Sequence, residues 1–160
     1  MRRTRPPQPQ TQGIKTMASF KPNDHHSIQA VDWPISQLPG LNSDNQTRLD
    51  NYGIKTTRQL LKKGKTPAEK MILANLLQIN IRDINKWIAM ADLARIPGVG
   101  CEYCGLLLHA GVSSVHHLTQ LSVHRLHQQI LRFYVVNLQR RDLCPSVDQI
   151  QQWVQQARFL

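Results

Sequence analysis

The residues whose types and spacing most clearly suggest a function are the basic side chains between Lys55 and Lys70, where Glu69 is the only acidic residue. They are Lys55, Arg58, Lys62, Lys63, Lys65 and Lys70. Such an excess of positive charge attracts polyanions and binds nucleic acid by releasing the counterions of its phosphates. The block is therefore a candidate phosphate-binding surface, and the alternative is a solvated helix face without a partner.

The whole chain has the same bias. Its 160 residues contain 20 Lys and Arg against 10 Asp and Glu, for a formal net charge of +10. This balance favours an acidic partner, with DNA first and RNA as an alternative. No apolar run is long enough to cross a bilayer, so we expect no membrane partner.

Cysteines form the second chemical cluster. Cys101 and Cys104 have the spacing of zinc ligands, and several histidines and Cys144 follow them. The alternative is that Cys104 packs in the core as a small apolar side chain. Ser43 and Gln46 stand at the positions that match the two cysteines in an earlier repeat, so the fold does not require a metal. We expect no metal site.

No catalytic arrangement is visible. The sequence has no nucleophile elbow, phosphate-binding P-loop or metalloprotease motif. We therefore expect a protein that is not an enzyme, with no cofactor and no small-molecule substrate. Its three cysteines do not suggest a disulfide framework, which favours a cytoplasmic location with reduced thiols.

The elements that position these residues recur along the chain. Pro39-Gly40 is repeated 58 positions later as Pro97-Gly98, and Gly53 and Leu60 are repeated as Gly111 and Leu118 in the same register. Both Pro-Gly and isolated Gly mark turns, so one unit of turns and helices occurs twice. We expect an all-α protein with a first unit at 31–95 and a second at 96–160.

A second correspondence supports the duplication at an offset of 66. It pairs Ile84, Trp87, Ile88, Ala91 and Leu93 with Ile150, Trp153, Val154, Ala157 and Phe159. The larger offset gives the second unit eight more residues, which we place in a long helix after Ser122.

Residues 1–30 are rich in Pro and Gln and poor in apolar side chains, which predicts a disordered basic arm. Met17 is an alternative start, and His25-His26 is more typical of a solvated pair than of a metal site.

Helix boundaries can be predicted from the caps. Thr66-Pro67 followed by Glu69 combines an N-cap, a proline in the first turn and a capping-box carboxylate. Thr56, Asn80 and Ser146 are further N-caps. The buried stripe of the helix after Thr66 is expected to be Ile72, Leu73, Leu76 and Leu77. No segment alternates long enough to predict a sheet.

The order of turns and helices resembles the helix-hairpin-helix motif. In that order an apolar-Pro-Gly-apolar turn is followed by a helix, and then by Gly-Ile/Val before a second helix. The tandem form, with Trp87 and Met90-Ala91-Asp92-Leu93 before the second turn and Pro145-Ser146 before the last helix, is more specific. Over about residues 31–160 it resembles the bacterial family known as domain of unknown function 4332. The resemblance implies a helix-hairpin-helix-like fold and no established activity.

The motif also implies a site. In helix-hairpin-helix proteins the glycines of the turn let backbone amides approach a phosphate at a helix N-terminus. Carried over to this chain, these residues are Gly40 in the first turn and Gly98 and Gly100 in the second. Asn42 replaces the second glycine in the first turn, and we expect it to tolerate the left-handed backbone conformation. In the second turn, the carboxylate of Glu102 repels phosphate. The alternative is that both turns only join packed helices.

We therefore expect a non-enzymatic adaptor that binds nucleic acid without sequence preference. Its predicted contacts are the turn glycines together with Lys55, Arg58, Lys62, Lys63 and Lys65. The alternative is a protein–protein interaction module with no nucleic-acid role.

Overall fold

A computed structural model of the chain describes residues 28–160. The predictions for the arm up to residue 27, for Met17 and for His25-His26 lie outside this range. The predicted all-α class is confirmed. The α-helices are α1 Ser43–Asn51, α2 Thr57–Lys63, α3 Pro67–Leu77, α4 Ile81–Ala94, α5 Gly100–His109, α6 Val115–Thr119, α7 Val123–Phe133 and α8 Val147–Arg158. Short 3-10 helices lie at η1 Ile35–Gln37 and η3 Arg141–Leu143, and η2 Tyr134–Leu138 is a π-helix.

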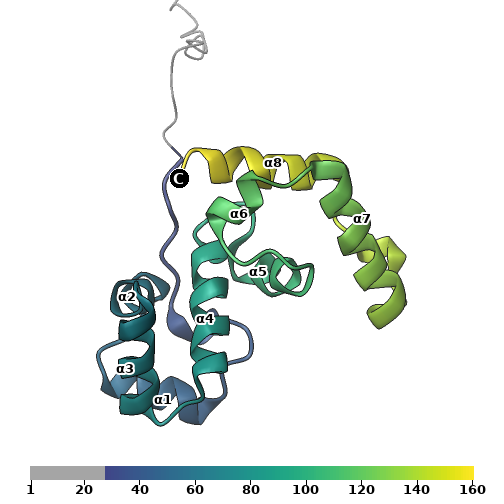
Figure 1. Ribbon diagram of the computed structural model, residues 1–160. Helices are drawn as coiled ribbons and strands as arrows, with labels where there is room; N and C mark the ends of the chain where they lie inside the picture. The colour runs from purple at the N-terminus through teal and green to yellow at the C-terminus, as the bar shows by residue number, and fades with distance from the viewer. Residues whose placement is uncertain (1–27) are drawn as a thin grey trace, which may run out of the picture.

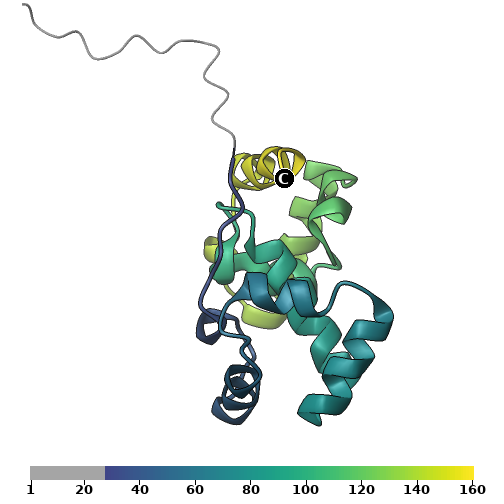
Figure 2. The same cartoon turned by 90° about the vertical axis from the view of Figure 1, so that its left-hand side faces the viewer.

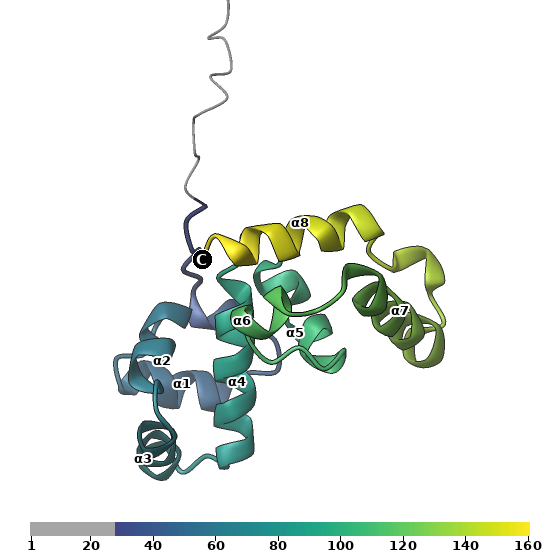
Figure 3. The same ribbon diagram turned by 45° about the horizontal axis from the view of Figure 1, so that its top comes forward.

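Helix α4 is the centre of the arrangement (Figure 1). Helices α1, α2 and α3 lie on one side of α4, and α5 and α6 pack near its C-terminal end. Helix α8 crosses this end, and α7 lies on the far side of α5 and α8 from α2 and α3 (Figures 1 and 3). No helix among residues 28–160 is both long and apolar enough to span a bilayer.

The segment before η1 ties α2 to α4. It runs along one side of the body (Figure 2), where Trp33 and Thr57 are joined by two hydrogen bonds. The Trp33 amide donates to the side-chain Oγ1 of Thr57 at 3.1 Å, and the Thr57 amide donates to the Trp33 carbonyl at 2.9 Å. The Trp33 indole N–H also donates to the Ala94 carbonyl at 2.8 Å. The Asp32 carboxylate accepts from the Arg58 amide at 2.9 Å and so caps α2 from outside the helix.

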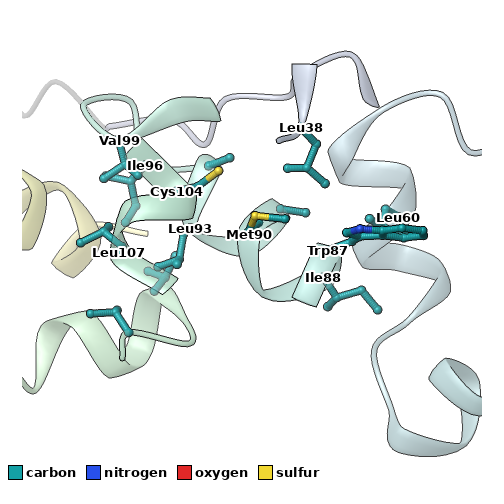
Figure 4. Packing of buried hydrophobic residues seen from close by; sticks show 14 of the residues in the cluster. Leu38, Leu60, Trp87, Ile88, Met90, Leu93, Ile96, Val99, Cys104 and Leu107 are labelled. Carbon is teal, nitrogen blue, oxygen red and sulfur yellow. The ribbon is translucent and has the colours of Figure 1, made fainter. Parts of the chain in front are cut away.

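One hydrophobic core runs through both predicted units. Figure 4 shows it extending from Leu60 and Trp87 at one end to Leu107 at the other, with Met90 and Cys104 between them. All five side chains are at most 2% exposed. Residues on both sides of the 95/96 boundary therefore stabilise each other by burying apolar surface together.

The turns after α1 and α5 repeat closely. The Ile54 amide donates to the Leu49 carbonyl at 2.9 Å, and 58 residues later the Val112 amide donates to the Leu107 carbonyl at the same distance. Gly53 and Gly111, which precede these amides, have φ of 76° and 92°. Glycine is the residue that adopts this conformation without a steric penalty.

The two Pro-Gly turns are less alike. Gly40 has a φ of 83°, whereas Gly98 is not in the left-handed region, and in the second turn Gly100 takes it with a φ of 54°. Asn42 does not adopt the left-handed backbone conformation that it was expected to tolerate. Asn42 is extended, and its side chain caps α1 by accepting from the Asn45 amide at 2.8 Å.

Two packing predictions are wrong. Ile72 and Leu76 are 58% and 51% exposed, because α3 contacts the core through Leu73, Ala74 and Leu77 instead. Phe159, which the repeat pairs with the buried Leu93, is 68% exposed because α8 ends one residue before it.

The predicted long helix after Ser122 is confirmed. Helices α3 and α7 both have 11 residues, but the π-helix η2 continues α7 without a break, so the helical run extends from Val123 to Leu138. The remaining additional residues fall in the region of η3.

Candidate nucleic-acid interface

A groove lies between α2, α3 and α4, with a volume of about 1040 Å³. We call it the α2–α4 groove. Five basic side chains line it, and we call them the rim: Arg58, Lys62, Lys65, Lys70 and Arg95. Four of them belong to the basic block that the sequence indicates, so the fold gathers charges that are spread over thirteen positions of the chain around one hollow.

The start of α2 decides which basic residues face the groove. Thr56 accepts from the Gln59 amide and forms a capping box, which fixes the first turn. Arg58 and Lys62 then share a helix face because they are four residues apart. Lys63 follows directly and is not among the residues that line the groove. Lys55 lies in a separate hollow with its Nζ 4.0 Å from Asp50 Oδ1. The structure thus brings together Arg58, Lys62 and Lys65 but not Lys55 or Lys63.

The groove also has an apolar part, which we call its floor. It consists of the apolar lining residues Leu61, Met71, Ile81, Ile88 and Ala89. Gly64 contributes to its shape, because a Cβ at this position would collide with the Ile88 side chain. Met71 is 50% exposed, so the floor presents apolar surface to solvent.

The acidic group of the groove is already engaged. One oxygen of Asp92 lies 2.9 Å from Arg95 Nη2, and the other accepts from the Val115 amide at 2.8 Å. Asp92 therefore caps α6 and offsets the charge of Arg95 alone. The other four rim cations form no ion pair among residues 28–160, although the carboxylates of Asp32 and Glu69 accept from the backbone amides of Arg58 and Lys65.

The second Pro-Gly turn has a packing role. The Gly98 amide donates to Gln156 Oε1 at 2.7 Å, and a Cβ on Gly98 would lie 2.7 Å from that oxygen and 2.9 Å from Trp153 Cδ1. A Cβ on Gly100 would lie 3.0 Å from the Trp33 ring. Both glycines allow other segments to approach the turn closely, and the Gly98 amide is used inside the protein. Gly40 differs, since nothing lies within 4 Å of its Cβ position.

We expect Gly98→Ala to lower the free energy of unfolding by about 1–3 kcal/mol, because the new methyl group overpacks the contact with α8. Gly105→Ala is the matched control: Gly105 lies inside α5, its Cβ position is 3.6 Å from Pro39, and the helix gains about 0.5–1 kcal/mol from the change. Urea denaturation followed by circular dichroism measures both. Equal stability of the two variants would refute the packing role of Gly98.

The cysteines give no sign of a metal centre. Cys104 is fully buried, and its thiol donates to the Cys101 carbonyl at 3.7 Å. Desolvation by burial, with a smaller contribution from the neighbouring Cys101, raises the pKa of the Cys104 thiol to about 12. Among residues 28–160, no three His, Cys, Asp or Glu side chains come close enough together to hold a metal ion.

Sequence reasoning missed Arg95 and the floor. Lys70 was part of the basic block, but Arg95 comes from the end of α4 and carries no local signal. The exposure of Met71 breaks the usual rule that apolar helix positions face the core. The sequence signal that could have identified Met71 as a groove residue is that it is apolar but lies outside the predicted buried stripe of α3.

Residues 39–160 match a protein family described as a domain of unknown function, DUF4332, and the chain belongs to this family. No curated protein and no solved structure matches the chain.

Proposed function

We propose that this protein is a non-enzymatic adaptor that binds nucleic acid without sequence preference through the α2–α4 groove. The observation that carries the proposal is the convergence of Arg58, Lys62, Lys65 and Lys70 around one hollow whose carboxylate is already paired with Arg95. DNA is the first candidate ligand and RNA the alternative.

The chemistry of the rim explains the expected lack of sequence preference. Lysine and arginine side chains on the rim contact phosphate oxygens, which are the same at every nucleotide. Each phosphate contact releases counterions, so the affinity falls linearly with salt on a logarithmic scale. The unpaired cysteines fit a reducing compartment, and we place the protein in the cytoplasm.

The test compares two triple variants of the full chain that lose the same charge. The first, Arg58→Gln/Lys62→Gln/Lys65→Gln, removes rim cations, and the second, Lys55→Gln/Lys63→Gln/Lys86→Gln, removes exposed cations away from the groove. Binding of a labelled oligonucleotide is measured by anisotropy across a salt series. We expect the rim variant to reduce the salt slope by about two to three, roughly one per lost contact, and the control to change it by less than one.

Equal slopes for the two variants would mean that positive charge attracts nucleic acid without a defined site. Wild-type protein that fails to bind at low salt would overturn the function itself.

A protein–protein interaction module is the second candidate. It is favoured by the occupied amide of Gly98 and by a group of exposed apolar side chains after α7. These are Val135, Val136, Leu138 and Leu143. This function predicts a protein partner that stays bound after nuclease treatment.

A further inference from the structure

The floor of the α2–α4 groove is not explained by phosphate binding. A purely electrostatic surface needs cations and polar donors, yet five apolar residues line the same groove as the cations. Rim and floor residues are neighbours in the chain: Leu61 precedes Lys62 on α2, and Lys70 precedes Met71 on α3. A ligand that lies along the groove therefore meets a cation and an apolar surface within one residue of each other.

We propose that the groove binds single-stranded nucleic acid, with phosphates on the rim and base faces on the floor. The inference rests on the proposed function and specifies its ligand. The chemistry is common to single-stranded DNA and RNA, because both combine a charged backbone with bases whose faces are apolar.

A duplex does not fit this surface equally well. It presents sugar and phosphate to the protein and keeps its base faces stacked in the interior, so the floor would remain uncovered. A single strand can turn its bases toward a surface while its backbone follows a positive groove.

The floor has no aromatic ring among its lining residues, so the contact is dispersion with aliphatic side chains. The Met71 thioether adds a favourable contact between sulfur and an aromatic ring. Such contacts tolerate any base.

The first test uses the full chain and probes of about twelve nucleotides, within the usual site size of ~4–16 for single strands. Oligo-dT, oligo-rU, a duplex and an abasic deoxyribose-phosphate oligomer are compared at one salt concentration. The abasic oligomer has the charge of oligo-dT but no bases. We expect at least one of the two base-containing single strands to bind about 10-fold more tightly than both the abasic oligomer and the duplex.

The second test separates the floor from the rim. Met71→Gln changes a floor residue, and Ile72→Gln is its matched control, because Ile72 is its neighbour on α3, is also exposed and does not line the groove. We expect Met71→Gln to weaken oligo-dT binding about 2- to 12-fold, the range of a sulfur–aromatic contact, with an unchanged salt slope. Abasic binding should stay the same, and Ile72→Gln should change neither.

The outcomes distinguish this inference from the function on which it rests. Equal affinity for duplex, abasic and base-containing strands, or equal effects of the two variants, overturns the single-strand inference and leaves nucleic-acid binding in place. No binding to any probe overturns both. A short amphipathic helix of Leu and Glu that binds the groove more tightly than oligo-dT also overturns the single-strand inference.

Discussion

Trp153→Ala should lower the free energy of unfolding by about 3–5 kcal/mol, the cost of removing a large aromatic side chain from a core. Trp153 is 1% exposed, and its ring lies 4.9 Å from the ring of Tyr103 at an interplanar angle of 42°. It also packs against Gly98, so its loss would leave the hydrogen bond from the Gly98 amide to Gln156 but remove the packing contact between the second Pro-Gly turn and α8. A domain is stabilised by only about 5–15 kcal/mol in total, and this variant should lose a large part of that.

Phe159→Ala is the control for Trp153→Ala. It also removes an aromatic ring from the C-terminal region, but Phe159 is 68% exposed, and exposed substitutions usually change stability by less than about 0.5 kcal/mol. Far-ultraviolet circular dichroism in urea is the appropriate measurement, because tryptophan fluorescence changes with the mutation. Similar losses for the two variants would contradict the assignment of Trp153 to the core.

Helix starts could be predicted because their determinants are local. Thr56, Thr66, Asn80 and Ser146 all cap the helices that the sequence assigned to them, each accepting an amide from the first turn. The side chain and the amide it receives are two or three residues apart in the chain, so the sequence alone contains both partners.

The face of α3 that contacts the core could not be predicted in the same way. Apolar residues occupy positions 71–74, 76 and 77, which cover most of the helix circumference. Periodicity then permits more than one buried stripe, and the packing against α4 selects Leu73, Ala74 and Leu77. The choice leaves Met71 free to line the groove.

In the candidate site, too, local features could be predicted from the sequence and tertiary contacts could not. A dense run of basic residues is visible in any sequence, but the neighbours Lys62 and Lys63 differ only in helix phase, and Lys62 alone lines the groove. The use of the Gly98 amide depends on Gln156, which is 58 residues away. No local pattern predicts that contact, and it removes one of the amides that the turn motif would offer to a phosphate.

Alkaline pH should destabilise the protein through Cys104. Burial raises the pKa of this thiol from 9.0 to about 12 in the folded state. Below about pH 9 both states keep the proton and the thiol contributes no pH dependence. Above it the unfolded chain releases the proton and the folded protein does not, so stability falls with rising pH until about pH 12. At about pH 10.5 the loss is about 2 kcal/mol, since each pKa unit corresponds to about 1.4 kcal/mol.

The measurement is the difference in unfolding free energy between about pH 7.5 and about pH 10.5, in a phosphine reductant, for the wild type and for Cys104→Ala. The alanine variant carries a packing cost that is the same at both pH values, and lysines and tyrosines titrate in both proteins, so these contributions cancel in the comparison. We expect the loss of stability at high pH to be about 2 kcal/mol smaller in the variant. Burial also raises the pKa of the half-buried Cys144, so Cys144→Ala is a control with the same sign and a smaller effect. Identical pH dependence in wild type and Cys104→Ala would show that the thiol reaches solvent, and the core packing at α5 would have to be revised.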